Sequence, residues 1–214
     1  RRFFKSTGIN PWAKNELTLL KDTERAWSDS STNLYMATAK SGGTSYAYMC
    51  DGPNIQASSN SFGSATQITN PCGNDILSIA SDGTNIFVAG NGKVVKVTGT
   101  TFTSPGADGT DYWTLANVDD VWVANGYLIA SVADRLTVLS SGSVASTNAD
   151  IASSSFNQVD SWVSVVGSPV GIFAAGNQGV QGRIYYIGIN DSTSALNVPV
   201  IAAELPVGET VNTI

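Results

Sequence analysis

Short apolar runs separated by turn residues recur along most of the chain. Residues 75–103 contain three such runs, at 76–80, 86–89 and 94–97, joined by Ser-Asp-Gly and Gly-Asn-Gly. Short β-branched runs bounded by turn residues are typical of strands rather than helices. Asp-Gly and Asn-Gly supply the positive φ angles that tight hairpins need. This stretch therefore predicts an antiparallel meander of three strands.

The same pattern occurs four times and can be aligned on an alanine that ends the second run. The four anchors are Ala37, Ala89, Ala130 and Ala174, so their spacings are 52, 41 and 44 residues. Propeller blades repeat about every 40 to 50 residues. We expect each anchor on the second strand of its blade, after an entry strand that lies around Trp27 in the first blade. A third strand and a weaker outer strand follow.

The expected fold is all-β, a β-propeller with about four visible blades of three to four antiparallel strands, as a complete ring or as part of a larger one. The predicted blades are 26–72, 73–116, 117–157 and 158–206, and residues 207–214 (VGETVNTI) repeat the start of an entry strand. An open arc of blades leaves apolar faces uncovered. We therefore expect either a piece of a longer chain or an arc that partner subunits complete, and in either case an oligomeric assembly.

Residues 1–25 differ from the rest and are expected to form an N-terminal arm or lead-in. They hold six of the eleven basic residues and an Asn-Pro-Trp break, with at most one helical turn near residues 14–20. Two interpretations stay open. The arm is either an ordered tail that packs on a neighbouring surface or an assembly arm that grips an acidic partner subunit.

Composition removes several functions. The net charge of −6 and the pI near 4.4 argue against a phosphate-binding face, so we expect no nucleic-acid partner. No apolar run approaches the roughly 20 residues that span a bilayer, which predicts no membrane insertion. The chain has no histidine, which removes the usual base of Ser and Cys triads and the commonest ligand of catalytic zinc.

The two cysteines, Cys50 and Cys72, lie 22 positions apart. A disulfide between them and two unpaired thiols are both compatible with this spacing. A metal site is not expected, because two cysteines without histidines supply half of a tetrahedral ligand set.

Two stretches carry a family resemblance. The segments SDGTNIFVAGNGKVVKV (81–97) and LPVGETVNTI (205–214) resemble blades of β-propellers in tail-associated and minor structural proteins of bacteriophages. The resemblance implies a non-enzymatic structural protein of a phage virion at the tail, neck or fibre, assembled in the host cytoplasm. Its implied partners are other virion subunits, with contact to a host-surface glycan as a further option and no cofactor.

The alternative is a carbohydrate-binding propeller, lectin-like or related to glycosidases. Asp119 and Asp160 each stand shortly before a tryptophan of an entry strand, Trp122 or Trp162, and such carboxylates could converge at one mouth of a ring. The interpretation favoured here is that they are turn residues that accept backbone amides before a strand. The other carboxylates considered are Asp108, Asp111, Asp120 and Asp134.

Aromatic residues divide into two groups. Trp27, Trp122 and Trp162 recur at blade entries and are expected in the core. Trp12, Tyr112 and Trp113 lie outside the repeat pattern and are the candidate contacts for a partner or a glycan.

Two further features have an ordinary explanation beside a functional one. Residues 106–113 (GADGTDYW) offer two carboxylates, too few for a calcium loop, and are expected to form a surface turn. Lys93, Arg135 and Arg183 open equivalent strands in three blades. They form either a basic rim or solvated charges that discourage edge pairing.

Overall fold

The computed structural model describes residues 9–10, 18–19, 34–59, 65–68, 70, 72, 75–103, 112–140, 145–150 and 159–214. The chain divides into two compact units, Arg1–Ser30 and Ser31–Ile214. The boundary therefore lies five residues after the predicted one. No helix in the described part of the chain is long and apolar enough to cross a membrane.

In the first unit, β1 (Ile9–Asn10) pairs antiparallel with β2 (Thr18–Leu19). Residues 18–19 are thus a strand, where at most a helical turn was predicted. Cross-strand hydrogen bonds satisfy the backbone there. Trp12 lies outside the described residues.

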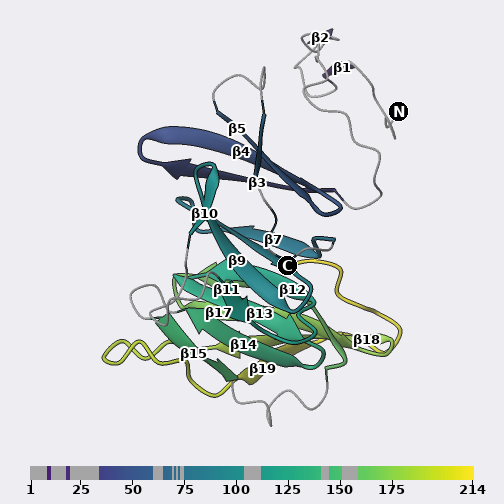
Figure 1. The fold of residues 1–214 in the computed structure, drawn as a ribbon. Helices are drawn as coiled ribbons and strands as arrows, with labels where there is room; N and C mark the ends of the chain where they lie inside the picture. Colours follow the sequence, from purple (N-terminus) through teal and green to yellow (C-terminus); the bar gives the residue numbers. More distant parts are fainter. Residues whose placement is uncertain are drawn as a thin grey trace. The chain divides into compact units, whose positions relative to one another are not determined.

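The described residues of the second unit form four antiparallel sheets, each built from strands in chain order (Figure 1). The first sheet contains β3 (Leu34–Ser41), β4 (Thr44–Asp51), β5 (Asn54–Ser59) and β6 (Thr66–Ile68). The second contains β7 (Ser78–Ser81), β8 (Ile86–Gly90), β9 (Lys93–Thr98) and β10 (Thr101–Thr103), and β11 (Tyr112–Thr114) also pairs with β9. The third contains β12 (Asp120–Ala124), β13 (Tyr127–Val132), β14 (Arg135–Ser140) and β15 (Ala145–Asp150). The fourth contains β16 (Ser161–Ser168), β17 (Gly171–Gln178), β18 (Gln181–Ile187) and β19 (Val200–Glu204).

The first strands of successive sheets lie next to one another. β3 contacts β7, β7 contacts β12, and β12 contacts β16. Sheets that pack face to face with their first strands adjacent are arranged as propeller blades are. The predicted all-β class and the four-blade organisation are therefore confirmed, and each sheet lies inside one predicted blade range.

Among the described residues of the second unit, three hydrophobic cores fill the spaces between the sheets. Tyr48 and Ile55 pack on Val88 between the first and second sheets, while Phe87 packs with Leu128 between the second and third. Between the third and fourth sheets the core includes Ile129, Leu136, Ile172 and Tyr185. Because side chains of a strand alternate between its two faces, β8 and β13 contribute to two cores each and are buried at every position. The continuous apolar runs of the sequence follow from this two-sided burial.

The strand assignment of the first blade differs from the prediction. The first hairpin of every sheet closes with a two-residue turn, at the pairs 41/44, 82/85, 124/127 and 168/171. Three positions into each returning strand stand Ala47, Val88, Ala130 and Ala174, spaced 41, 42 and 44 residues apart.

Two of the four predicted anchors, Ala130 and Ala174, occupy this equivalent position. Ala89 is displaced by one residue, and Ala37 lies on the innermost strand β3 instead of the second strand. The entry strand of the first sheet therefore begins at Leu34 and not near Trp27, which is outside the described residues. An alternating apolar run looks the same on either strand, and only the contact with β7 decides between them.

Candidate interaction surfaces

Asp119 and Asp160 occupy the same place in the third and fourth sheets, directly before the first strand. The Asp119 carboxylate accepts the N–H of Ala133 at 2.8 Å, and the Asp160 carboxylate accepts the N–H of Gly179 at 2.9 Å. Both amides belong to the turn between the second and third strands. The backbone N–H of each aspartate also donates to its second strand, to Ser131 O or Asn177 O. The turn interpretation of these two carboxylates is therefore confirmed.

In the second, third and fourth sheets the residue two positions ahead of the first strand is buried. These residues are Ile76, Val118 and Val159, and each is at most 3% exposed. Ile76 belongs to the core formed with the first sheet, and Val118 to the core formed with the second. A β-branched side chain thus leads the chain from one sheet onto the next.

Val211 repeats this arrangement on the fourth sheet. Its N–H donates to the side-chain oxygen of Asn177 at 2.8 Å, and its carbonyl accepts the Asn177 amide at 2.9 Å. Gly182 leaves room for it, because a Cβ there would lie 2.8 Å from Val211 Cγ2. Residues 207–214 therefore lie where the sequence predicts the start of a fifth entry strand, although the segment forms no strand in the structure.

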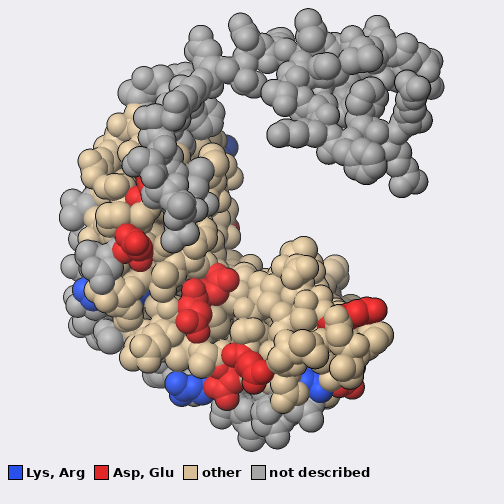
Figure 2. All heavy atoms as spheres, turned by 90° about the vertical axis from the view of Figure 1, so that its right-hand side faces the viewer, with Lys and Arg blue, Asp and Glu red and all other residues tan. Residues whose placement is uncertain are grey.

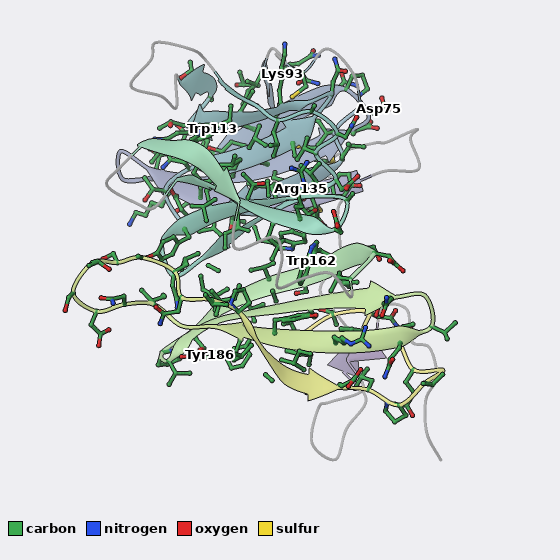
Figure 3. The ribbon with its side chains drawn as sticks, turned by 90° about the horizontal axis from the view of Figure 1, so that it is seen from below. Asp75, Lys93, Trp113, Arg135, Trp162 and Tyr186 are labelled. Atoms are coloured by element: carbon green, nitrogen blue, oxygen red, sulfur yellow. The ribbon has the colours of Figure 1, made fainter. Side chains whose placement is uncertain are left out.

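The fourth sheet has an outward face, the face turned away from the third sheet. Cross-strand pairing places Val166, Phe173, Tyr186 and Val200 in one row across all four strands. The Phe173 and Tyr186 rings lie 5.4 Å apart at 50°. Tyr186 lies on the side of the sheet opposite Trp162, which packs toward the third sheet (Figure 3). This row is apolar and lacks a covering sheet in the described part of the chain.

The outward face of the first sheet, turned away from the second sheet, mixes apolar and polar side chains. Its β3 and β4 positions alternate with the core positions and form the cross-strand pairs Met36–Met49, Thr38–Ala47 and Lys40–Ser45. A cavity of about 380 Å³ lies beside the polar end of this face and reaches Gly83 of the second sheet. Its lining consists of Thr38, Ala39, Lys40, Ser45, Tyr46, Ala47, Ser58 and Gly83.

The predicted aromatic contacts are placed differently from expectation. Trp113 is 8% exposed and packs in the core between the second and third sheets, with its ring 6.1 Å from that of Phe87. Its assignment as a partner or glycan contact is therefore wrong, because pairing of β11 with β9 carries it into the core. Tyr112 pairs with Val95 through the backbone, and its side chain is outside the described part. Asp108 and Asp111 also lie outside, so the predicted turn at 106–113 stays a prediction over most of its length.

The three basic residues do not share one position. Lys93 and Arg135 each close the turn between second and third strands, opposite Gly90 and Val132. Arg183 lies two residues further into its strand and is only 6% exposed. Its guanidinium donates to Glu204 at 2.7 and 3.0 Å, to Gln178 at 2.6 Å and to Gln181 at 3.2 Å. Arg183 is therefore a buried strand-to-strand contact and not part of a basic rim.

Cys50 and Cys72 are both buried free thiols in the core between the first and second sheets. Burial raises the pKa of Cys50 to about 12, with a contribution from the neighbouring Cys72. Burial also raises the pKa of Cys72 to about 11, against the opposing effect of Lys93. Among the described residues, no group of three potential metal ligands occurs.

Asp120 makes a contact between sheets that the sequence analysis did not identify. Ser78 Oγ donates to the Asp120 carboxylate, which also accepts the N–H of Val121 at 2.8 Å. Burial raises the pKa of Asp120, and these hydrogen bonds oppose that effect. Ser78 and Asp120 are the first residues of two inner strands, so correct repeat alignment would have predicted their proximity.

Acidic side chains outnumber basic ones on the face drawn in Figure 2. This distribution agrees with the net charge of −6. A face of this kind repels phosphates.

No protein-family model matches the chain, and no curated protein matches it. Among solved structures, it is similar to the dihydro-haem d1 dehydrogenase NirN, with 14% identity and a TM-score of 0.52 over 84% of this chain and 38% of that one. It is also similar to the WD40 β-propeller domain of Doa1, with 12% identity and a TM-score of 0.39 over 79% and 70% of the two chains. A glutaminyl cyclase from Myxococcus xanthus has 12% identity and a TM-score of 0.35 over 86% and 80%.

The chain spans about two fifths of the length of the NirN chain that it matches. At this identity the likeness concerns the fold alone, which is that of β-propeller blades.

Proposed function

We propose that this chain is a non-enzymatic propeller module of a bacteriophage virion, at the tail, neck or fibre, which works through contacts of its sheet faces with other subunits. The observation that carries the proposal is the apolar outward face of the fourth sheet, with Val211 seated on it as Ile76 and Val118 are seated on their sheets. Between the described sheets, faces with apolar side chains of this kind are buried against the neighbouring sheet. The resemblance of residues 81–97 and 205–214 to phage propeller blades supplies the virion context.

The alternative of a glycosidase-related propeller rested chiefly on Asp119 and Asp160 as a pair of catalytic carboxylates. Asp119 and Asp160 accept turn amides in their own sheets. Trp113, the expected sugar platform, is a core residue. What supports the structural role is therefore the apolar surface rather than a group of reactive side chains.

The test is mass spectrometry and immuno-electron microscopy of purified particles of the phage that encodes the chain. We expect the chain in a fixed copy number and at one place on the tail, neck or fibre. Particles that contain their other tail proteins but lack this chain would overturn the proposal.

Carbohydrate recognition remains the second candidate because of the cavity on the first sheet. Hydroxyl groups of Thr38, Ser45 and Ser58 and the Lys40 ammonium suit a small polar sugar. A glycan array compares the wild type with Lys40→Ala, and with Gln67→Ala on the outer strand as a control. Binding that Lys40→Ala abolishes supports this candidate, and no binding on the array eliminates it.

A further inference from the structure

We propose that the cavity beside the first sheet binds an acidic sugar, with the Lys40 ammonium holding the carboxylate of the ligand and neighbouring hydroxyl groups holding its ring. Binding of this kind rests on carbohydrate recognition, the second candidate function, and specifies the class of sugar. The volume of about 380 Å³ is within the usual range of sites for small ligands.

Two neighbouring sheets of the chain build this cavity. Its lining comes from β3, β4 and β5 of the first sheet and from Gly83, in the turn between β7 and β8. The N–H of Lys40 donates to Gly83 O at 2.7 Å, and Ser81 Oγ donates to Thr38 O at 2.7 Å. These two contacts fix β3 against the turn of the second sheet. A site whose walls are held before the ligand arrives loses less entropy on binding.

Cross-strand pairing places the polar side chains close together. Thr38, Ala47 and Ser58 lie opposite one another on three strands, and Lys40 and Ser45 form the next pair on the same face. Neighbouring strands are about 4.8 Å apart, and alternate residues of a strand about 7 Å. The three hydroxyl groups and the stem of Lys40 therefore surround an area of roughly 10 by 7 Å, enough for one sugar ring.

Most of these polar groups are available to a ligand. Among the described residues, neither the Lys40 ammonium nor the hydroxyls of Thr38 and Ser45 have a hydrogen bond or an ion pair. Arg183, in contrast, is held by Glu204. Ammonium and hydroxyl groups are donors, so the oxygens of a sugar acid can bind to three donors that no other residue has to release.

The charge of the site favours an acidic ligand over a neutral one. Of the described residues that line the cavity, only Lys40 is charged. Asp82 precedes Gly83, but its carboxylate accepts the N–H groups of Thr84 and Asn85 at 2.7 and 2.6 Å and is thus engaged in its own turn. Hydrogen bonds to charged groups are stronger than those between neutral groups. A ligand with one carboxylate and several hydroxyls therefore matches the site best.

A single cavity of this kind binds weakly. One charge-assisted contact and a few hydroxyl contacts must offset the entropy that the ligand loses, so we expect a dissociation constant of about 1 mM. Several copies of the chain on one particle would raise the overall affinity for a surface that carries many such sugars.

The test is a two-dimensional ¹H–¹⁵N NMR titration of the purified full chain with sugars up to about 20 mM, a range that covers weak binding. The acidic probes are methyl glucuronide and a methyl sialoside, and methyl glucoside is the neutral match of the first. We expect both acidic probes to shift the amide signals of Thr38, Lys40 and Ser45. They should bind about tenfold or more tightly than the glucoside, because the glucoside lacks the charged acceptor.

Two variants locate the charge that matters. Lys40→Met keeps the aliphatic stem and removes the ammonium, and should weaken binding of the acidic probes about tenfold or more. Lys96→Met, on β9, removes the same charge outside the cavity lining and should bind them as the wild type does. Far-ultraviolet circular dichroism shows that both variants are folded.

Four results would overturn the inference: no shift with either acidic probe, equal binding of glucuronide and glucoside, equal binding of acetate, or equal losses in the two variants. Equal binding of acetate would show an anion site that does not recognise sugar. Binding of the glucoside alone would contradict this inference and leave carbohydrate recognition in place. Virions that lack the chain would contradict the proposed virion role alone.

Discussion

Asp119 and Asp160 have the same structural role because they occupy the same place in two repeats. Each carboxylate holds the turn between the second and third strands of its sheet. The side chains are exposed, so each hydrogen bond is partly in competition with water. Their contribution is therefore local to one turn.

Replacing either aspartate with alanine should lower the free energy of unfolding by about 1 kcal/mol, the usual net value of one hydrogen bond. The double variant should lose the sum, because the two turns share no partner. Asparagine at either position keeps an acceptor oxygen and serves as the control. Urea unfolding measures the values, and a double variant far from additive would contradict two independent turn contacts.

The buried thiols lead to a prediction about reactivity. Only the thiolate reacts, and burial raises the pKa of Cys50 and Cys72 to about 12 and 11. We expect no rapid reaction of the folded chain with a disulfide reagent at pH 8 and two reactive thiols after unfolding without reductant. If none appears after unfolding, the cysteines form the disulfide that the sequence analysis left open.

Asp120 makes stability depend on pH. Its pKa in the folded chain is raised by burial, so the folded state binds the proton more tightly than the unfolded state does. This tighter binding of the proton stabilises the folded state below the pKa that an aspartate has in the unfolded chain. The stabilisation is lost as the pH rises through the raised pKa of the folded state.

Asp120→Asn should therefore be more stable than the wild type at neutral pH, with a difference that shrinks as the pH falls toward the ordinary range of an aspartate. Urea unfolding at several pH values measures this difference. Asp191→Asn, at an exposed position, controls for the loss of one negative charge. A difference that grows as the pH falls would contradict the assignment.

At the scale of elements, Arg183 joins β18 to β19 through its ion pair with Glu204, in addition to the backbone pairing of the two strands. The guanidinium is nearly buried, while the Glu204 side chain is 47% exposed. Removing one member of a fully buried pair costs about 3–5 kcal/mol, and solvent around Glu204 reduces that figure.

We expect Arg183→Ala to lower the free energy of unfolding by about 2–3 kcal/mol. Lys40→Ala, at an exposed lysine of strand β3, removes a basic residue from the surface and should stay within about 0.5 kcal/mol of the wild type. Chemical unfolding measures both. Equal effects would show that Arg183 acts as a surface charge.

At the scale of the whole molecule, the described part of the chain has three cores that each join two neighbouring sheets. In such a linear arrangement each sheet depends most on its neighbours. Damage to one core should therefore remain local at first.

Ile172→Ala removes a fully buried side chain from the core between the third and fourth sheets and should cost about 3 kcal/mol. Hydrogen exchange should accelerate in these two sheets and much less in the first. Ile86→Ala, in the core between the first and second sheets, should give the reverse distribution. Uniform acceleration in both variants would indicate that the four sheets open as one unit.

Alternation of apolar residues and turn chemistry was enough to predict the strands and the repeat. Runs such as residues 86–89 can be buried on both faces only between two sheets, and the spacing of the runs set the number of sheets. The placement of Val211 follows from the same regularity, because its segment repeats those that carry Ile76, Val118 and Val159.

Tertiary structure alone decided which strand of the first sheet is innermost, since residues 34–39 alternate equally well in either place. It also placed Trp113 in a core and buried Arg183, because the partners of both residues come from strands whose pairing no local pattern specifies. The same holds for the contrast between the two outward faces. Alternation along the sequence tells which residues share a face, but which face another sheet covers depends on contacts between sheets, such as that of Ser78 with Asp120, 42 positions apart.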